Sequence, residues 1–218
     1  MLLSTVRKTV NGEKAMKLHK QIIALALSSL LLASLGPAGL LAKSKAQHTC
    51  GDKCGSYRWP VKTLTDLDKD NVDFSPQAMS VSELADAPRP KSKPKDSRVS
   101  ALELRVVKVD AQIIAFFREG DRDVHIILAD PNDTTKQIVA EIPNVQCAGA
   151  CFSKHRSDFK SAREKFVERL GEPGTSRKNI SNPVLVHIVG IPFFDKKHKQ
   201  KGGAPNAIEL HPVLDISF

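Results

Sequence analysis

The chain lacks the patterns that would reveal an activity at once. We find no internal repeat among its 218 residues, which excludes a solenoid or an array built from copies of one unit. No serine or cysteine stands in a recognisable nucleophile motif, so the sequence gives no support to covalent hydrolysis. Aromatic residues make up only 5% of the chain, with tryptophan and tyrosine once each. The sequence therefore indicates a fold and a compartment more clearly than a function.

The apolar run near the N-terminus is too short to span a membrane. Ile22 to Leu35 is apolar except for serines, about fourteen residues where a spanning helix needs about 20. Three lysines precede the run between Lys14 and Lys20, and Gly36-Pro37 would end any helix. A positive start followed by a short apolar core predicts a secretory signal peptide and flank over residues 1–46, with an uncleaved anchor as the alternative. We expect an exported protein, periplasmic or extracellular, with no stable membrane span after processing.

The positive charge is concentrated in two clusters. The formal net charge is +9, and without residues 1–42 there remain 28 basic and 23 acidic side chains, or +5. Either cluster could contact phosphates or anionic glycans. Prolines interrupt the first cluster, which favours an extended, soluble linker there. The first cluster consists of Arg89, Lys91, Lys93, Lys95 and Arg98, and the second of Lys196, Lys197, Lys199 and Lys201.

Four cysteines form two pairs of equal spacing. Cys50 and Cys54 are separated by three residues, as are Cys147 and Cys151. In an exported chain an even number of cysteines predicts disulfides. Two short-spaced pairs could instead supply four thiolates to a structural zinc ion. Three pairings are possible, and the sequence does not choose among them. Local pairing, within each short-spaced pair, would close two tight loops, whereas either crossed pairing, between the pairs, would tie the N-terminal segment to the later chain.

The later chain predicts a small β fold. A long apolar strand begins near Leu102, and a switch of alternation between Val106 and Val107 indicates a β-bulge. Residues with helical spacing then run from Phe159 to Leu170, ended by Gly171 and Pro173. We expect a mainly β protein with a closed five-stranded OB-like barrel (β-β-β-α-β-β) over residues 99–218, preceded over 47–98 by an irregular N-terminal arm and a Pro/Lys-rich linker. The other strands are expected at Val124–Ala129, Gln137–Ile142, Val184–Ile191 and Ile208–Phe218, with Trp59 anchoring the arm.

Several segments resemble those of a family of uncharacterised exported bacterial proteins. The most specific is the C-terminal segment Gly203-Ala204-Pro205-Asn206-Ala207-Ile208-Glu209-Leu210-His211-Pro212. The resemblance implies bacterial export and implies no activity. In that family a glycine usually stands between the histidine and glutamine of the loop, where this chain has Lys199, and glycine is common at the position of Ala207. The other similar segments are 58–66, 124–131, 140–143 and 190–195.

Two groups of residues would suit an enzyme that uses a divalent metal. Asp195, Glu209 and His211, near His198, offer carboxylate and imidazole ligands, and Glu209 and His211 share a strand face. Alternation favours the simpler interpretation that this face is solvated, and we predict no cofactor. Asp130 and Asp133 follow a predicted strand and resemble the calcium-binding strand end of the thermonuclease family. That family has an arginine where this chain has His125, five residues before Asp130, and a glutamate where it has Asp133. An ordinary turn explains them as well. His187 is expected to be a hydrogen-bonded wall residue of its apolar strand.

The favoured function is a non-catalytic binding or accessory module of unknown partner. OB barrels bind oligonucleotides and oligosaccharides with two strands and two loops. The loop from Asp195 to Asn206 is long and basic, which suits an anionic polymer such as nucleic acid or a glycan. The second and third strands hold no aromatic residue, so we expect contact with charged groups rather than with bases. The alternative is a metal-dependent phosphodiesterase or nuclease. Candidate ligand-binding residues are Lys196, Lys197, His198, Lys199, Lys201 and Asn206.

Overall fold

The computed structural model describes residues 50–91, 95–197 and 202–218, all of which belong to one compact unit. The predicted signal peptide over 1–46 lies outside the described residues, as do Lys93 and three of the candidate loop residues, His198, Lys199 and Lys201. Within the described ranges, no helix has the length and apolar character that a membrane crossing requires.

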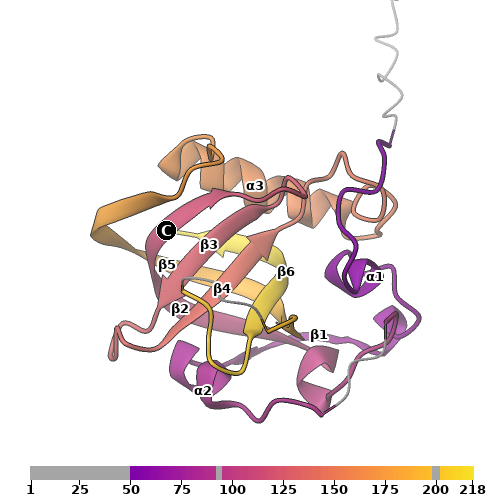
Figure 1. Ribbon diagram of the computed structural model, residues 1–218, viewed down its shortest axis with the longest axis horizontal. Coiled ribbons are helices and arrows are strands. Elements are labelled where there is room, and N and C mark those ends of the chain that lie inside the picture. The colour runs from indigo at the N-terminus through magenta and orange to yellow at the C-terminus, as the bar shows by residue number, and fades with distance from the viewer. Residues whose placement is uncertain (1–49, 92–94, 198–201) are drawn as a thin grey trace, which may run out of the picture. The chain divides into compact units, whose positions relative to one another are not determined.

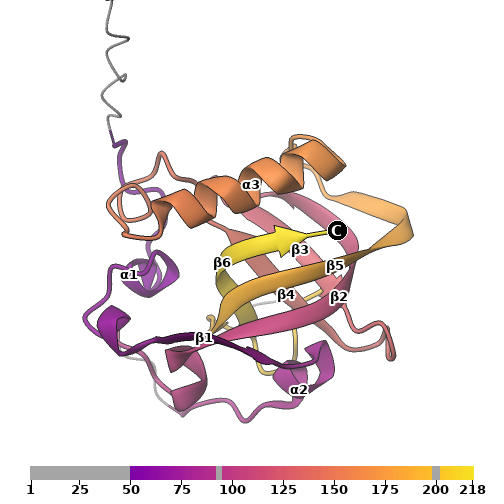
Figure 2. The same cartoon turned by 180° about the vertical axis from the view of Figure 1, so that it is seen from behind.

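The protein is mainly β, as predicted, with one sheet of six strands rather than five. The order in the sheet is β1-β2-β3-β4-β6-β5, and β5 pairs in addition with β2. Strand pairing therefore runs from β2 through β3, β4, β6 and β5 back to β2 (Figures 1 and 2). The strands are β1 (Asp73–Ala78), β2 (Arg105–Arg118), β3 (Val124–Ala129), β4 (Gln137–Ile142), β5 (Lys178–Phe194) and β6 (Ile208–Ser217).

Two helices lie at opposite ends of this ring of strands (Figures 1 and 2). Helix α3 (Arg156–Leu170) contributes Ala162 and Phe166 to the main hydrophobic core, and α2 (Val81–Asp86) contributes Val81 and Leu84. A capping box begins α2, because the Ser80 hydroxyl accepts from the backbone N–H of Glu83 while the Glu83 carboxylate accepts from that of Ser80. The remaining helix, α1 (Trp59–Lys62), is a single turn, and short 3-10 turns span Lys69–Asn71 and Ala101–Leu104.

The expected bulge in the first long strand lies at a different place. Val106 and Val107 are both buried because the two faces of β2 pack against different clusters, Val107 in the main core and Val106 in a second cluster. The register of β2 shifts between Ile113 and Ala115 against β3 and β5. Its pairing with β1 is also irregular opposite Arg105 and Val107, where the extra residues belong to β1. The switch of alternation at Val106 therefore reflects burial on both faces. The second cluster consists of Leu64, Val72, Val106, Ala150, Phe159 and Ile191.

The segment before β2 is more regular than the predicted irregular arm. It contains α1, α2 and β1, and β1 pairs in parallel with β2. All six residues of β1 are exposed, so no apolar alternation marks this strand in the sequence. Leu64 and Leu84 are buried against the sheet in the two clusters, which explains why these scattered apolar residues need no core of their own.

Candidate functional site

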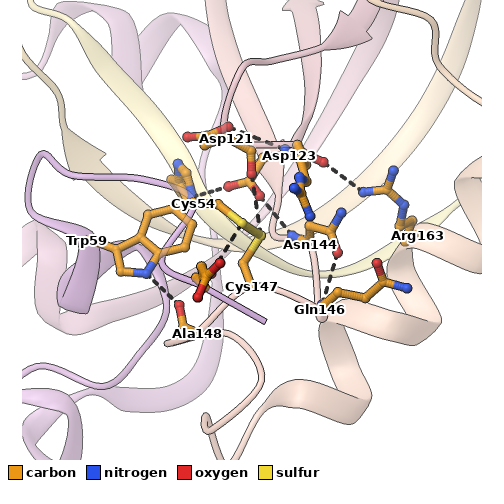
Figure 3. The surroundings of a disulfide bond; sticks show 12 residues. Cys54, Trp59, Asp121, Asp123, Asn144, Gln146, Cys147, Ala148 and Arg163 are labelled. Atoms are coloured by element: carbon orange, nitrogen blue, oxygen red, sulfur yellow. Dashed lines mark hydrogen bonds and ion pairs between the residues drawn. A yellow bond between two sulfur atoms is a disulfide. The ribbon is translucent and has the colours of Figure 1, made fainter. Parts of the chain in front are cut away.

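Two disulfides tie the N-terminal segment to the chain between β4 and α3. Cys50 bonds Cys151 and Cys54 bonds Cys147, so the predicted disulfides are present with a crossed connectivity. All four cysteines are thereby used, and none remains as a thiolate for zinc. Because such bonds persist in oxidising compartments, they support an exported location. Figure 3 shows the inner bond beside Trp59, Asp121 and Asp123.

Trp59 fixes the segment beside this bond. Its indole Nε1 donates to the carbonyl of Ala148 at 2.7 Å (Figure 3), and the side chain is only 4% exposed. The neighbouring Gly149 has a φ of +94°, and a Cβ there would lie 2.6 Å from Trp59 Nε1. Only glycine meets both conditions. The tryptophan therefore serves as the anchor that the sequence predicts.

Two buried ion pairs hold the same segment on the sheet. Arg58 forms a bidentate pair with Glu103, with distances of 2.8 and 2.7 Å, and donates further to the carbonyls of Phe194 and Ser97. Arg98 pairs with Asp66 at 2.9 Å. In both pairs the side chains are 1% exposed or less. Planar bidentate pairing suits arginine and fixes geometry as well as charge.

Beneath α1 lies a group of ionisable side chains that we call the covered cluster. His125 pairs with Glu141 across β3 and β4, and Val139 pairs with Glu209 across β4 and β6. Continuing the parallel register by two residues places His211 beside Glu141. These positions alternate with core residues, so they share the face of the sheet that turns away from the main core. The covered cluster consists of Lys62, Asp123, His125, Glu141, Glu209 and His211, all of them buried.

Glu141 is the centre of the covered cluster. One carboxylate oxygen lies 2.9 Å from Nδ1 of His125, and the other lies 2.7 Å from Nδ1 of His211 and 3.6 Å from Nζ of Lys62. On the far side of the imidazole, Nε2 of His211 lies 3.4 Å from Oδ2 of Asp123. Three nitrogen-bearing side chains thus surround one buried carboxylate.

The pKa values in the covered cluster are pushed apart by burial and by these neighbours. Burial alone would raise the pKa of Glu141, but Lys62 and His211 hold it well below its ordinary value. Burial raises the pKa of Glu209 well above its ordinary value, and the charge of Glu141 adds to the effect. Burial also raises the pKa of Asp123 to about 6. Burial and Lys62 both oppose charging of His211, yet Glu141 and Asp123 outweigh them and raise its pKa to about 9.

A cavity of about 280 Å³ opens between the disulfide-tied segment and the loop after β5. Lys62 connects it to the covered cluster, since its side chain lines the cavity and also contacts Glu141. Asp121 contributes from the turn between β2 and β3, whereas Asp195 and Lys196 contribute from the loop after β5. Tyr57 and Trp59 give the cavity its aromatic wall.

The loop that carries Lys196 has a firmly bonded base. Arg89 donates to the backbone carbonyls of Asp195 and Asn206, one at each end of the loop. The Asn206 amide donates to the carbonyls of Leu84 and Ala87, and its oxygen accepts from the backbone of Ile208. Asn206 therefore shapes the loop with both ends of its side chain, and Arg89, expected in a soluble linker, clamps it.

The predicted site residues that the structure describes lie on the loop, at its base and beneath α1, and Asp195 at the base is close enough to Glu209 for its charge to add to the raised pKa of that group. Lys196 and Lys197 are exposed on the loop, and Asp195 is buried at its base, on the cavity wall. Glu209 and His211 do share one face of β6, but that face is buried rather than solvated, because the disulfide-tied segment covers it. The expected solvated face is therefore wrong for these two residues.

The residues of the nuclease alternative do not meet. Asp130 accepts hydrogen bonds from the backbone N–H and hydroxyl of Ser82 and lines a separate cavity of about 420 Å³. His125 contacts Glu141 in the covered cluster instead. His187, expected in an apolar wall, is exposed and lies 2.6 Å from Asp110, because its face of β5 turns away from the core.

Sequence reasoning missed Lys62, Asp123 and Glu141 as members of a common site. One signal was available: polar residues stand at the same alternating positions of three strands that become neighbours. That pattern is ambiguous, since it describes a solvated face equally well. The choice depends on whether another segment covers the face, which alternation within a strand does not reveal.

Comparison with known proteins adds no assignment: no family model, curated protein or solved structure matches the chain.

Ala207, at the end of the loop, adopts a conformation that favours glycine. Its φ is 54°, in the left-handed region that costs an alanine about 1–2 kcal/mol. We expect Ala207→Gly to raise the free energy of unfolding by about 0.5–1 kcal/mol, because the relief of strain exceeds the entropy that glycine loses on folding. Urea denaturation measures the effect. Ala204→Gly is the matched control, since Ala204 is buried in the same loop and should lose stability, and equal losses in both variants would contradict the prediction.

Proposed function

We propose that the protein is an exported, non-catalytic binding module with an OB-like barrel, and that it binds an anionic polymer along the loop between β5 and β6. The barrel assignment is supported by the pairing of β5 with β2 and by the position of α3 between β4 and β5. That order matches the three strands, helix and two strands of the OB class. Export is supported by the two disulfides together with the signal-like N-terminus.

The disulfide-tied segment limits where such a barrel could hold its ligand. OB barrels bind with the face of the second and third strands and with the loops after the first and fourth. Here the corresponding face carries His125 and Glu141, which are buried. Both loops reach the cavity: Asp121 of the turn between β2 and β3 lines it, and so does Lys196 of the loop after β5. We therefore assign binding to the rim of the face.

One observation carries the proposal: Lys196 lies at the edge of a cavity on a loop whose two ends are clamped. Lys197 is exposed beside it. Because the clamp lies next to Lys196, this residue loses little conformational freedom when a ligand binds, and it presents its charge at a defined place. Lysine acts as a point charge toward phosphate or sulfate groups. The shared chemistry of the ligand is thus a row of anionic groups.

The test is a comparison of two lysine pairs. We expect a fluorescein-labelled 20-nucleotide single strand to bind the oxidised protein with strong salt dependence, measured by anisotropy between 50 and 200 mM salt. In Lys196→Ala/Lys197→Ala the affinity at 50 mM should fall about three- to tenfold, and the slope of log K against log salt should fall by about 1.4, or about 0.7 for each lost phosphate contact.

The matched control is Lys160→Ala/Lys165→Ala, which removes the same charge from α3, where both lysines already pair with carboxylates. Competition by unlabelled single strand and by heparin distinguishes nucleic acid from a sulfated glycan as the preferred polymer. Equal losses of affinity in both double variants would show that only the net charge of the protein matters, which would contradict a site at the loop. Absence of binding to both polymers would overturn the proposal.

A further inference from the structure

Three buried residues of the covered cluster have the composition of a metal site. Asp123, Glu141 and His211 each offer one ligand atom, and these atoms lie within 4.8 Å of one another. Glu141 and His211 lie on β4 and β6, and Asp123 is the residue just before β3, where its carboxylate accepts from the backbone of Asn144. A set of imidazole nitrogen and carboxylate oxygen is one that zinc prefers in proteins. We propose that Asp123 and His211 ligate one divalent transition-metal ion of the zinc class, and that Glu141 holds the histidine at its other ring nitrogen.

The contact between Asp123 and His211 points to an ion independently of residue type. Asp123 uses one carboxylate oxygen to accept from the backbone of Asn144 at 2.8 Å. Its other oxygen and Nε2 of His211 have no hydrogen-bond partner in the described part of the chain, although they lie 3.4 Å apart. Two ligands at about 2.0–2.2 Å from one tetrahedral ion are about 3.4 Å apart. An ion between them would satisfy two buried polar atoms that are otherwise costly.

Glu141 completes the group from the other side of the imidazole. Its Oε2 lies 2.7 Å from Nδ1 of His211, and its Oε1 lies near His125. Metal-binding histidines are commonly held by a carboxylate at their second ring nitrogen, which fixes the tautomer and the direction of the ring. Glu141 is therefore placed both to orient His211 and to contribute negative charge within reach of the ion.

Replacing Lys62 distinguishes a metal site from a purely structural cluster. Its ammonium lies 3.6 Å from Glu141, so its positive charge opposes a metal ion bound to the neighbouring His211. It also lines the cavity together with Asp121, two residues before Asp123, so the cavity lies beside the covered cluster. A purely structural cluster needs Lys62 to balance Glu141, whereas a metal site should bind its ion more tightly without it.

The experiment measures binding of Zn²⁺ and Co²⁺ to the oxidised, EDTA-treated protein by calorimetry and by the visible absorption of bound Co²⁺. We expect one ion per chain. Asp123→Asn, which keeps the shape of the side chain, should weaken Zn²⁺ binding at least tenfold, and His211→Ala should do the same. Lys62→Met should tighten it about tenfold or more and should increase the rise in melting temperature that Zn²⁺ produces.

The control is His187→Ala, which removes an exposed histidine that contacts Asp110 and should leave binding unchanged. Far-UV circular dichroism establishes that each variant is folded, and a thiol assay establishes that the disulfides are intact. Absence of stoichiometric binding would overturn the proposal, as would binding that Asp123→Asn leaves intact or that Lys62→Met weakens. If His211→Ala does not fold, Asp123→Asn and Lys62→Met still decide between the two outcomes.

Discussion

Replacing Arg58 by methionine should lower the free energy of unfolding by about 3–5 kcal/mol, the range found when one partner of a buried pair is removed. The guanidinium makes four hydrogen bonds, two to Glu103 and one each to the carbonyls of Phe194 and Ser97. Glu103 is 0% exposed, so its charge would be left in a medium that stabilises it poorly. The guanidinium also lies 4.7 Å above the Phe193 ring, a contact that methionine keeps only in part.

Urea denaturation of three variants separates the charge from the packing. Arg58→Met/Glu103→Gln removes both charges, and it should recover about 1–3 kcal/mol relative to Arg58→Met because no unpaired carboxylate remains. The recovery is incomplete because Glu103 also accepts from the backbone N–H groups of Val99 and Phe194. Arg105→Met is the control, since Arg105 is exposed on β2, and it should change stability by less than about 0.5 kcal/mol. A loss in Arg58→Met no greater than in this control would show that the buried pair does not hold the segment.

Arg58 belongs to the segment that covers the face of the sheet bearing Glu141. The arginine, Trp59 and the two disulfides all act on one short segment. Trp59 and the disulfides connect it to residues 147–151, and Arg58 connects it to Glu103. Together they place α1 over the face of the sheet that bears Glu141. Burial of this face explains the shifted pKa values and leaves only its rim for a large ligand.

Strands whose two faces differ, or that are apolar throughout, were predictable from the sequence. The bounds of β3 and β4 agree with the predicted 124–129 and 137–142, because turn residues flank short apolar runs. β5 begins six residues before the predicted Val184. Its first six residues are mostly polar and mostly exposed, and the first two pair with the far end of β2. A strand that extends beyond the core carries no apolar pattern, so the sequence gives no sign of it.

The candidate site was predictable only in part, for a different reason. Glu209 and His211 were identified as a pair on one face of a strand, and they do lie together. Their partners Lys62 and Asp123 lie 147 and 86 positions before Glu209 and come together only through the closure of the sheet and the crossed disulfides. Burial of charge by a distant segment is a tertiary effect, and local periodicity contains no information on it.

Removing both disulfides should destabilise the protein by more than the sum of the losses from removing each one alone. With neither bond in place, the first closes a loop of 101 or 93 residues, which corresponds to about 4.7 kcal/mol in the chain-entropy model. The bonds are nested, so once one exists the other closes only about eight further residues, worth about 2.5 kcal/mol in the same model. We therefore expect about 2.5 kcal/mol for Cys54→Ser/Cys147→Ser or for Cys50→Ser/Cys151→Ser, and about 7 kcal/mol for the quadruple variant.

Urea denaturation of the three variants, followed by tryptophan fluorescence, measures this difference. Trp59 is a suitable probe because it is buried beside the inner bond and bonded to Ala148. A natural domain is stable by about 5–15 kcal/mol in total, so the quadruple variant should be largely unfolded or strongly destabilised, whereas either double variant should fold. If the two doubles together lost as much as the quadruple, the bonds would act independently. The crossed, nested connectivity would then fail to explain how the segment is held over the sheet.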